Sequence, residues 1–528
     1  MLAVMAAMAG LTVAGCGGSA APAKPAGGDV SLVMAVAPNS LDPAVGSNPE
    51  ALEADWLVYT PLLTYPHANG LPGTHVTDGL ASAPPTVSDG GRTYALTLQP
   101  GLVYSNGQPV KASDFRWAVE RAIRLGWRDA PELLTSRIVG AAAFAAGRAK
   151  TISGISTDDA TGAITIRLTA PWGEFENVLA LPATAPVPST TPMRTESADP
   201  PPGIGPYVFG RIVPGRSFSA RPDPNWRPGP SGIPVGQVSV SVRITGSPRV
   251  NALAVLHNTA DVFDSNDRIP LGLLPTIVRD AADRYSKQAV NGTYFIFMNI
   301  ARKPFSSLPV RIAVQTALDD NTLRGLGPGM LQEGCFLIPP SMAGHSHDQC
   351  PRGNIEQGGD LAAAKALVAR SGLAGTPVTV WGEAEPPFSA WMAYYTTLLG
   401  ELGFKARIKL TAPASYRATV AARAPNPQTG FDEFSAGLPS PVDFYQRLTA
   451  LGDPYLTRQV RILSAVPSSE LGSIADFWHR LELYVADHAY VAVFGYQTVP
   501  QFVSDRLDYK RLVLSPVAGL DWTSFHLR

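Results

Sequence analysis

The chain has few cysteines and few charges for its length. It contains 3 cysteines among 528 residues, which excludes a framework of several disulfides. Charged residues make up 16%, and 42 basic against 43 acidic side chains leave a net charge of −1. Without a basic excess nothing in the composition attracts a phosphate backbone, so we expect no nucleic-acid partner.

Recognised enzyme motifs and long apolar runs are also missing. The sequence has no Gly-x-Ser-x-Gly elbow, no His-Glu-x-x-His and no P-loop. A catalytic site assembled from distant residues would leave no such motif, so these absences alone do not exclude an enzyme. After the first sixteen residues, no run approaches the roughly 18–20 apolar residues of a transmembrane helix. An apolar content of 45% nevertheless provides for sizeable cores, and the length allows more than one domain.

The start of the chain is small and apolar and ends in the letters VAGC at Cys16. This resembles the lipobox of bacterial lipoproteins, whose cysteine is acylated after the preceding peptide is removed. We assign 1–16 to a lipoprotein signal peptide and 17–29, rich in Gly, Ala and Pro, to a flexible tether. No basic residue precedes Lys24, which indicates a start codon further upstream. The alternative is an unprocessed apolar N-terminus.

Once Cys16 is assigned to lipid, Cys335 and Cys350 remain as an even pair. In an oxidising envelope such a pair usually forms a disulfide, which we predict here. The alternative is a metal site, because His345, His347 and Asp348 lie beside Cys350. The spacing of these residues matches no recognised structural zinc site, so the disulfide is favoured and we predict no metal.

The segment 89–123 predicts a strand, a turn and a capped helix in that order. Tyr94, Leu96 and Leu98 alternate with polar residues, as in a strand with one buried face. Asn106-Gly107 supplies a tight turn, and Ser113 stands where a helix N-cap belongs, followed by Asp114. The same reasoning predicts strands at 238–244 and 404–410, and helices over 361–371, 391–402 and 474–484.

This segment resembles the signature of the peptide-type solute-binding proteins of ABC importers, family 5. Five further segments match that family in the right order: Leu41-Asp42-Pro43-Ala44, Tyr59-Thr60-Pro61-Leu62, Gly203-Ile204-Gly205-Pro206-Tyr207, Asn299 to Phe305, and Val310-Arg311. Within this family, the chain resembles the lipoproteins of actinobacteria, in particular mycobacterial-like ones. The alternation of strands and helices independently indicates an α/β protein.

The resemblance implies an α/β fold of the periplasmic-binding-protein type II, with two lobes, a hinge and an extra subdomain in lobe I. Lobe I would comprise 30–285, with the extra subdomain at about 70–190. Lobe II would comprise 286–494, and residues 495–528 would return to lobe I. The resemblance also implies a monomer without enzymatic activity and without a cofactor.

The resemblance implies ligand contacts only at positions where this sequence matches a family motif. The loop after the "LDP" motif contacts ligand in peptide binders, and here it contains Ser47, Asn48 and Glu50. A family aromatic and an arginine seven residues later match Tyr416 and Arg423. For this pair the alternatives of surface packing and of a solvated cation stay open.

One departure from the family bears on the ligand. Peptide binders read "GW-ADY-DP" where this chain has Gly437, Leu438 and, after Pro441, Asp443. The family tryptophan and the aspartate that pairs with a peptide's α-amine are both missing. Asp443 either replaces that aspartate or caps the next helix. An unpaired buried ammonium costs several kcal/mol, so the sequence disfavours a conventional peptide with a free amine.

The resemblance implies a lipid-anchored protein on the outer face of the cytoplasmic membrane, in the cell envelope. It would capture a peptide or peptide-like solute by hinge closure and deliver it to the transmembrane subunits of an ABC permease. The alternative is an envelope lipoprotein that uses the same fold as a regulatory interaction module.

Overall fold

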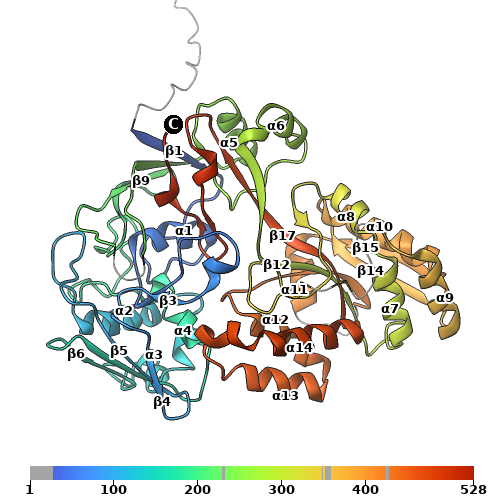
Figure 1. Cartoon of the computed structure of the whole chain (residues 1–528), viewed down its shortest axis with the longest axis horizontal. Coiled ribbons are helices and arrows are strands. Elements are labelled where there is room, and N and C mark those ends of the chain that lie inside the picture. Colours follow the sequence, from blue (N-terminus) through green and yellow to red (C-terminus); the bar gives the residue numbers. More distant parts are fainter. Residues whose placement is uncertain (1–27, 229–231, 348, 351–357, 422–426) are drawn as a thin grey trace, which may run out of the picture.

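The computed structural model describes residues 28–228, 232–347, 349–350, 358–421 and 427–528. An 11-stranded mixed sheet runs through it in the order β15-β14-β16-β12-β17-β11-β1-β10-β9-β8, with β13 also on β17 (Figure 1). The strands are β1 (Asp29–Met34), β8 (Tyr207–Val213), β9 (Ser217–Pro222), β10 (Ser239–Ile244), β11 (Val262–Phe263), β12 (Tyr285–Met298), β13 (Leu331–Gln332), β14 (Pro377–Glu383), β15 (Lys405–Thr411), β16 (Thr429–Ser435) and β17 (Val491–Val503).

Two long strands, β12 and β17, join the two halves of this sheet. We call the strands from β11 to β8 the first half, and β16, β14 and β15 the second half. The first half pairs with β17 near its end, at Val262↔Val503, whereas the second half pairs with β12 from Gly292 onward. Between Ala289 and Thr293 the register of β12 against β17 shifts. The lobe boundaries expected from the sequence, at 285/286 and 494/495, lie within these two strands.

A separate four-stranded sheet lies below the first half, in the order β4-β5-β7-β6 (Figure 1). Its strands are β4 (Thr86–Ser88), β5 (Thr93–Thr97), β6 (Ile155–Asp158) and β7 (Ala163–Arg167). Tyr94 and Leu96 are buried, as the alternation predicted, and they share a core with Phe115 of α2 (Ala112–Arg124) and with Phe175. This sheet falls inside the range predicted for the extra subdomain.

The helices follow the periodicity in the sequence. They are α1 (Pro49–Val58), α2, α3 (Ala141–Ala145), α4 (Phe175–Val178), α5 (Pro248–Leu256), α6 (Leu274–Asp280), α7 (Leu308–Ala317), α8 (Asp320–Leu326), α9 (Leu361–Ser371), α10 (Phe388–Glu401), α11 (Pro413–Ala421), α12 (Pro441–Leu448), α13 (Pro454–Leu463) and α14 (Ala475–Asp487). The helices predicted from 361, 391 and 474 are confirmed as α9, α10 and α14. None of the helices within the described residues has the length and apolar composition needed to cross a bilayer.

The predicted cap of α2 was wrong. The helix begins at Ala112, one residue before Ser113, and the carboxylate of Asp114 accepts a hydrogen bond from the backbone N–H of Lys111 at 3.0 Å. Ser113 instead donates its hydroxyl to Asp159 at 2.9 Å. The hydroxyl that the local pattern predicted as the cap of the helix is therefore bound to Asp159, 46 positions away in the sequence.

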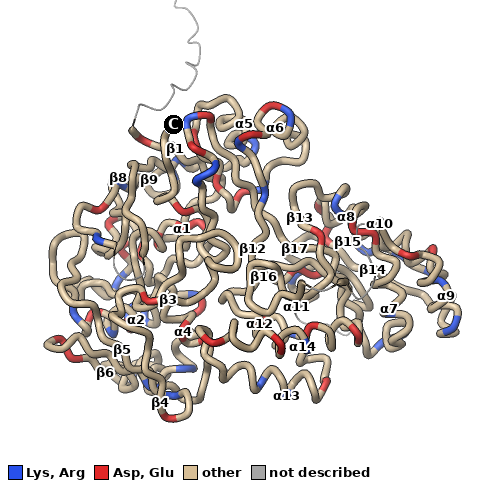
Figure 2. The backbone as a smooth tube through the Cα atoms, viewed as in Figure 1, with Lys and Arg blue, Asp and Glu red and all other residues tan. Residues whose placement is uncertain are grey.

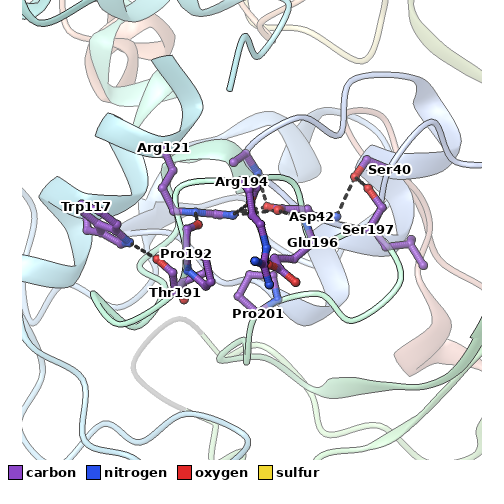
Figure 3. Close-up of polar contacts among 12 residues, drawn as sticks. Ser40, Asp42, Trp117, Arg121, Thr191, Pro192, Arg194, Glu196, Ser197 and Pro201 are labelled. Atoms are coloured by element: carbon purple, nitrogen blue, oxygen red, sulfur yellow. Dashed lines mark hydrogen bonds and ion pairs between the residues drawn. The ribbon is translucent and has the colours of Figure 1, made fainter. Parts of the chain in front are cut away.

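A buried ion pair holds α2 to the start of the chain (Figure 3). Both guanidinium NH₂ groups of Arg121 donate to the carboxylate of Asp42, at 3.0 and 2.8 Å, and both side chains are inaccessible to solvent. Arg121 also donates to the carbonyls of Pro192 and Arg194. Asp42 belongs to the motif at 41–44, so this motif has a structural role. It holds the four-stranded sheet, together with α2, to the first half of the large sheet.

Candidate ligand-binding site between the two halves of the sheet

The carboxyl ends of parallel strands in both halves mark the candidate site. In the first half β1, β10 and β11 are parallel, and in the second half β14 is parallel to β15 and β16. Ligands of α/β proteins bind outside such ends, where the backbone leaves the sheet in loops. The loop 264–268 follows β11, Glu383 ends β14, and Glu433 lies near the end of β16.

Four charged side chains meet there. Arg417 of α11 donates from Nε to Glu383 at 3.1 Å. Glu433 accepts a hydrogen bond from the side-chain amide of Gln497 at 3.3 Å. Arg268 extends from the first half, and its guanidinium lies 5.4 Å from the centre of the Phe388 ring in the second half. Because Gln497 belongs to β17, the candidate site adjoins the strands that join the halves.

The environment of Glu433 mixes burial with positive charge. The side chain is half-buried, and burial raises the pKa of its carboxyl. The guanidinium groups of Arg268 and Arg417 oppose that rise, whereas Glu383 adds to it. Elsewhere Lys and Arg are interspersed with Asp and Glu over the part of the chain that the structure describes (Figure 2). The candidate site thus has charges of both signs and fits an organic ligand that carries polar or charged groups.

A further contact joins the four-stranded sheet and its helices to the segment 464–468, which directly follows α13. The backbone N–H of Gly173 donates to the carbonyl of Ser464 at 2.9 Å, and the N–H of Ser468 donates to the carbonyl of Gly173 at 3.1 Å. The side-chain amide of Asn177 donates to Ser468 at 2.8 Å. A Cβ atom on Gly173 would lie 1.7 Å from the carbonyl oxygen of Val466. We call this the 173/466 contact; only glycine permits it.

Comparison with known proteins identifies the family. Residues 75–454 match the model of bacterial extracellular solute-binding proteins, family 5, middle part, which is more than half of the chain. This chain belongs to that family. Its members are solute-binding proteins, in agreement with the absence of enzyme motifs from the sequence.

Relatives and solved structures agree with this assignment. The chain is 28% identical over 300 residues to the probable deoxycholate-binding periplasmic protein YgiS of Escherichia coli K12, covering 54% of this chain and 53% of the relative. It is 24% identical over 347 residues to the glutathione-binding protein GsiB of Salmonella typhi, covering 61% and 59%. These matches span little more than half the length of the relatives.

Solved structures share the fold over nearly the whole length. The unliganded open form of the murein tripeptide binding protein MppA has a TM-score of 0.80 at 17% identity, covering 96% of this chain and 98% of that one. The clavulanic acid biosynthesis oligopeptide binding protein 2 has a TM-score of 0.78 at 22% identity, covering 95% of each chain. The predicted α/β fold of the periplasmic-binding-protein type II is therefore confirmed.

In this family 5 protein, the loop at 47–50 is ordered by its own hydrogen bonds. Asn48 caps α1 by accepting from the N–H of Ala51 at 3.2 Å, and it donates to Glu50 at 2.6 Å. The hydroxyl of Ser47 accepts from the amide of Asn39 at 3.2 Å. Burial raises the pKa of Glu50. Contact of Ser47, Asn48 and Glu50 with a ligand remains a prediction.

The residues predicted in the second half lie in different environments. Tyr416 is 2% exposed; its ring stacks on Phe431 at 5.2 Å and its hydroxyl donates to the carbonyl of that residue. Arg423 lies outside the described residues. Gly437 is exposed, whereas Leu438 is buried in the core of the four-stranded part. The structure thus does not bring Tyr416, Gly437 and Leu438 together around one described space, and the contact of these residues and of Arg423 with a ligand stays a prediction.

Asp443 is not the cap of α12. Ser440 is the N-cap, accepting from the N–H of Val442 at 3.2 Å, and Asp443 lies in the first turn. Its carboxyl comes close to Glu174 of the four-stranded part, which also accepts a hydrogen bond from the Ser440 hydroxyl. The sequence pattern could not reveal this neighbour, because Glu174 belongs to a distant segment.

The charge of Asp443 therefore acts on the buried carboxyl of Glu174, which lies one residue from Gly173 of the 173/466 contact. Burial, reinforced by Asp443, raises the pKa of Glu174 to about 8, and its Oε2 atom has no hydrogen-bond partner. Burial and the charge of Glu132 raise the pKa of Asp443 to about 6. Because the pKa of Glu174 is higher in the folded than in the unfolded chain, its contribution to the free energy of unfolding is fully present below about pH 4. That contribution is lost as the pH rises through about 8.

We expect Glu174→Gln to flatten the pH dependence of stability. In the wild type, unfolding free energy should fall between pH 5 and pH 9, since folding must then keep Glu174 protonated or bury its charge. The variant has no proton to lose at this position. Urea unfolding at pH 5, 7 and 9 measures the slope, with Glu401→Gln on the exposed face of α10 as the matched control. Equal slopes for the wild type and Glu174→Gln would contradict this account.

The predicted disulfide is present. Cys335 and Cys350 are joined, with their Cα atoms 5.9 Å apart. The Nδ1–H of His345 donates a hydrogen bond to the carbonyl of Ile338, 2.7 Å away, and Asp348 lies outside the described residues. Among the residues that the structure places, no group of His, Cys, Asp or Glu is arranged to hold a metal ion. The disulfide closes a loop that packs against β12, where Ser341 donates to Asn291 at 2.8 Å.

Proposed function

We propose that this chain is the substrate-binding protein of an ABC importer and captures a peptide or peptide-like solute between the two halves of its large sheet. The observation that carries the proposal is the meeting of charged side chains from both halves at the carboxyl ends of their parallel strands. A solute bound there touches both halves, so it favours the arrangement in which both contacts form. The solute would then pass to the transmembrane subunits of a permease.

The relatives support a small organic solute. One relative is named for deoxycholate, another for glutathione, and a third is the probable peptide ABC transporter periplasmic-binding protein y4tO of Sinorhizobium fredii. Deoxycholate, glutathione and short peptides are all small organic molecules that carry a carboxylate. The peptide type suits the mixed charges of the candidate site best, because peptides carry charges of both signs.

The finer parts of the proposal rest on the sequence. We propose lipid attachment at Cys16, which would hold a monomer to the outer face of the cytoplasmic membrane, as in actinobacterial lipoproteins. Lobe I would comprise 30–285 and 495–528, and lobe II 286–494. Ser47, Asn48, Glu50, Tyr416, Arg423, Gly437, Leu438 and Asp443 are the ligand contacts that the family resemblance supports.

One observation favours a second candidate, the regulatory interaction module. Leu438, at the position of the family tryptophan, is buried against the four-stranded part rather than exposed to a solute. In that case the fold would present a surface to an envelope protein and would take up no solute.

Thermal unfolding with added solutes separates the two candidates. Soluble protein starting at residue 17 is heated alone and with a tryptic peptide pool, glutathione or deoxycholate. A solute that binds only the folded state at 100 times its Kd stabilises it by about 2.7 kcal/mol, which raises Tm. A rise with any of the three supports a binding protein. An unchanged Tm with all three at millimolar concentration contradicts it and favours the interaction module.

A further inference from the structure

The outer strand of the second half, β15, leaves one side of its backbone unpaired. It stands at the end of the large sheet, and it pairs with β14 without a break from Pro377↔Lys405 to Glu383↔Thr411. The part of the chain that the structure describes contains no second neighbour for this strand. An edge of this kind presents a row of free N–H and C=O groups, which can pair with another extended segment.

The hydrogen bonds at the two ends of β15 show which residues face the open side. The N–H of Lys405 donates to the carbonyl of Thr376 at 3.1 Å, and the carbonyl of Thr411 accepts from the N–H of Ala384 at 2.8 Å. The backbone groups of Lys405 and Thr411 therefore point toward β14. Successive residues of a strand direct these groups to opposite sides. The groups that point to the open side thus belong to the alternate residues Ala406, Ile408 and Leu410.

One face of β15 is basic, and the strand contains no carboxylate. Arg407 donates from Nε to the hydroxyl of Thr379 at 3.0 Å, and the ammonium of Lys409 lies 3.8 Å from the centre of the Trp381 ring. Both cations therefore lie on the face that they share with these two residues of β14. Lys405 belongs to the same face by alternation. Among the described residues, no carboxylate forms an ion pair with any of the three cations.

The opposite face of β15 is apolar and incompletely covered. A Cβ atom on Gly382 of β14 would lie 2.6 Å from Met392 of α10 and 3.1 Å from Leu410, so α10 packs on this face. Nevertheless Ile408 and Leu410 are each 39% exposed. The helix thus leaves more than a third of both side chains in solvent, next to the unpaired edge.

We propose that β15 is a docking edge for an extended segment of a partner protein in which acidic and apolar residues alternate. Such a segment would add a strand to the sheet and pair its backbone with the open side of β15. Its carboxylates would lie beside the three cations, and its apolar side chains would cover Ile408 and Leu410. The docking edge contains none of the residues of the candidate solute site, so it does not depend on the proposed function.

Charge and backbone chemistry select this partner over two others. A second copy of the chain is disfavoured, because two β15 strands side by side would bring like charges together. An anionic lipid surface would satisfy the cations, but it has no backbone to pair with the open N–H and C=O groups. An acidic extended segment meets the basic face, the apolar face and the unpaired backbone at once.

Isothermal titration calorimetry with three capped seven-residue peptides tests the proposal. The first alternates glutamate with valine, the second has lysine in place of each glutamate, and the third has the composition of the first with its glutamates and valines in separate blocks. We expect the wild type to bind the alternating acidic peptide at least about 10-fold more tightly than either of the others, since cross-strand pairs of opposite charge stabilise a sheet and like charges destabilise it.

Two variants with matched controls locate the contact. Ile408→Pro removes an N–H on the open side and leaves the pairing with β14 intact, so it should weaken binding about 10-fold, whereas Ile408→Thr keeps the N–H and should bind nearly as well as the wild type. The double change Arg407→Glu with Lys409→Glu should reverse the preference to the lysine peptide. Lys365→Glu with Arg370→Glu, on the exposed face of α9, alters net charge equally and should not reverse it.

Hydrogen exchange provides an independent readout, because the acidic peptide should slow exchange over 405–411 in the wild type but not in Ile408→Pro. Equal or absent binding of the three peptides, or full binding by Ile408→Pro, overturns the proposal. Binding to vesicles of anionic lipid without binding of the acidic peptide, or a dimer that Ile408→Pro abolishes, overturns it as well. The proposed function is judged separately, since Ile408→Pro should keep any rise in Tm with the peptide pool, glutathione or deoxycholate.

Discussion

Replacing Arg121 by Met should lower the free energy of unfolding by about 3–5 kcal/mol, since it leaves a buried carboxylate without its charge partner. The carboxylate of Asp42 would keep only its hydrogen bonds from the N–H groups of Ala44 and Glu196, at 3.1 and 2.9 Å. Arg121 would also cease to satisfy the carbonyls of Pro192 and Arg194. A loss of this size is a large part of the 5–15 kcal/mol that stabilises a typical domain. Urea unfolding followed by circular dichroism measures it.

Two further variants show whether the pairing itself causes the loss. Arg128→Met removes an exposed guanidinium that pairs with Asp129 at 3.0 Å, and it should cost less than about 1 kcal/mol. The double variant Asp42→Asn with Arg121→Met should be less destabilised than the sum of the single variants, as expected for directly coupled side chains. A loss under 1 kcal/mol for Arg121→Met would show that the pair does not stabilise this fold.

Replacing Gly173 by Ala should break the 173/466 contact. The added Cβ would lie far inside the van der Waals distance of the Val466 carbonyl, and backbone on both sides prevents an easy shift. Forced overpacking of this kind costs about 1–3 kcal/mol. We expect a lower Tm and faster amide exchange at Ser468, whose N–H donates to the Gly173 carbonyl. Hydrogen exchange read by mass spectrometry locates the change.

Gly472→Ala is the matched control for this variant. It lies in the same region of the chain, and a Cβ there meets no atom within 4 Å. Its Tm and its exchange at Ser468 should stay near those of the wild type. If Gly173→Ala exchanges like Gly472→Ala, the contact seen between the four-stranded part and the second half does not persist in solution.

The local elements could be predicted from the sequence because their causes are local. The helix α9 ends at Gly372, where φ is +67°, and β5 buries Tyr94 and Leu96 as alternation requires. The cap of α2 could not be predicted, because Asp159 attracts Ser113 from elsewhere in the chain. Local patterns give the elements, while tertiary hydrogen bonds adjust their ends.

Contacts between distant segments, including those of the candidate site, show the same division more strongly. The motif around Asp42 was recognisable in the sequence, but its partner Arg121 lies 79 positions away. Arg268 and Glu433 were missed because neither belongs to a short motif; only the pairing of β11, β17, β12 and β16 brings them together. A signal was available at Glu433, since two acidic residues interrupt the apolar pattern of the strand Phe431-Asp432-Glu433-Phe434. Charge inside a buried strand indicates a site more often than a core.

Native mass spectrometry of the protein purified without denaturation, starting at residue 17, tests the central claim most directly. We expect bound masses in a ladder spaced like amino-acid residues, which denaturation releases and which peptides with free ends restore. A single discrete organic mass would keep the solute-binding function and change the substrate. A clean mass of the bare chain, unshifted by peptide pools, would contradict the account of a solute held between the two halves of the sheet.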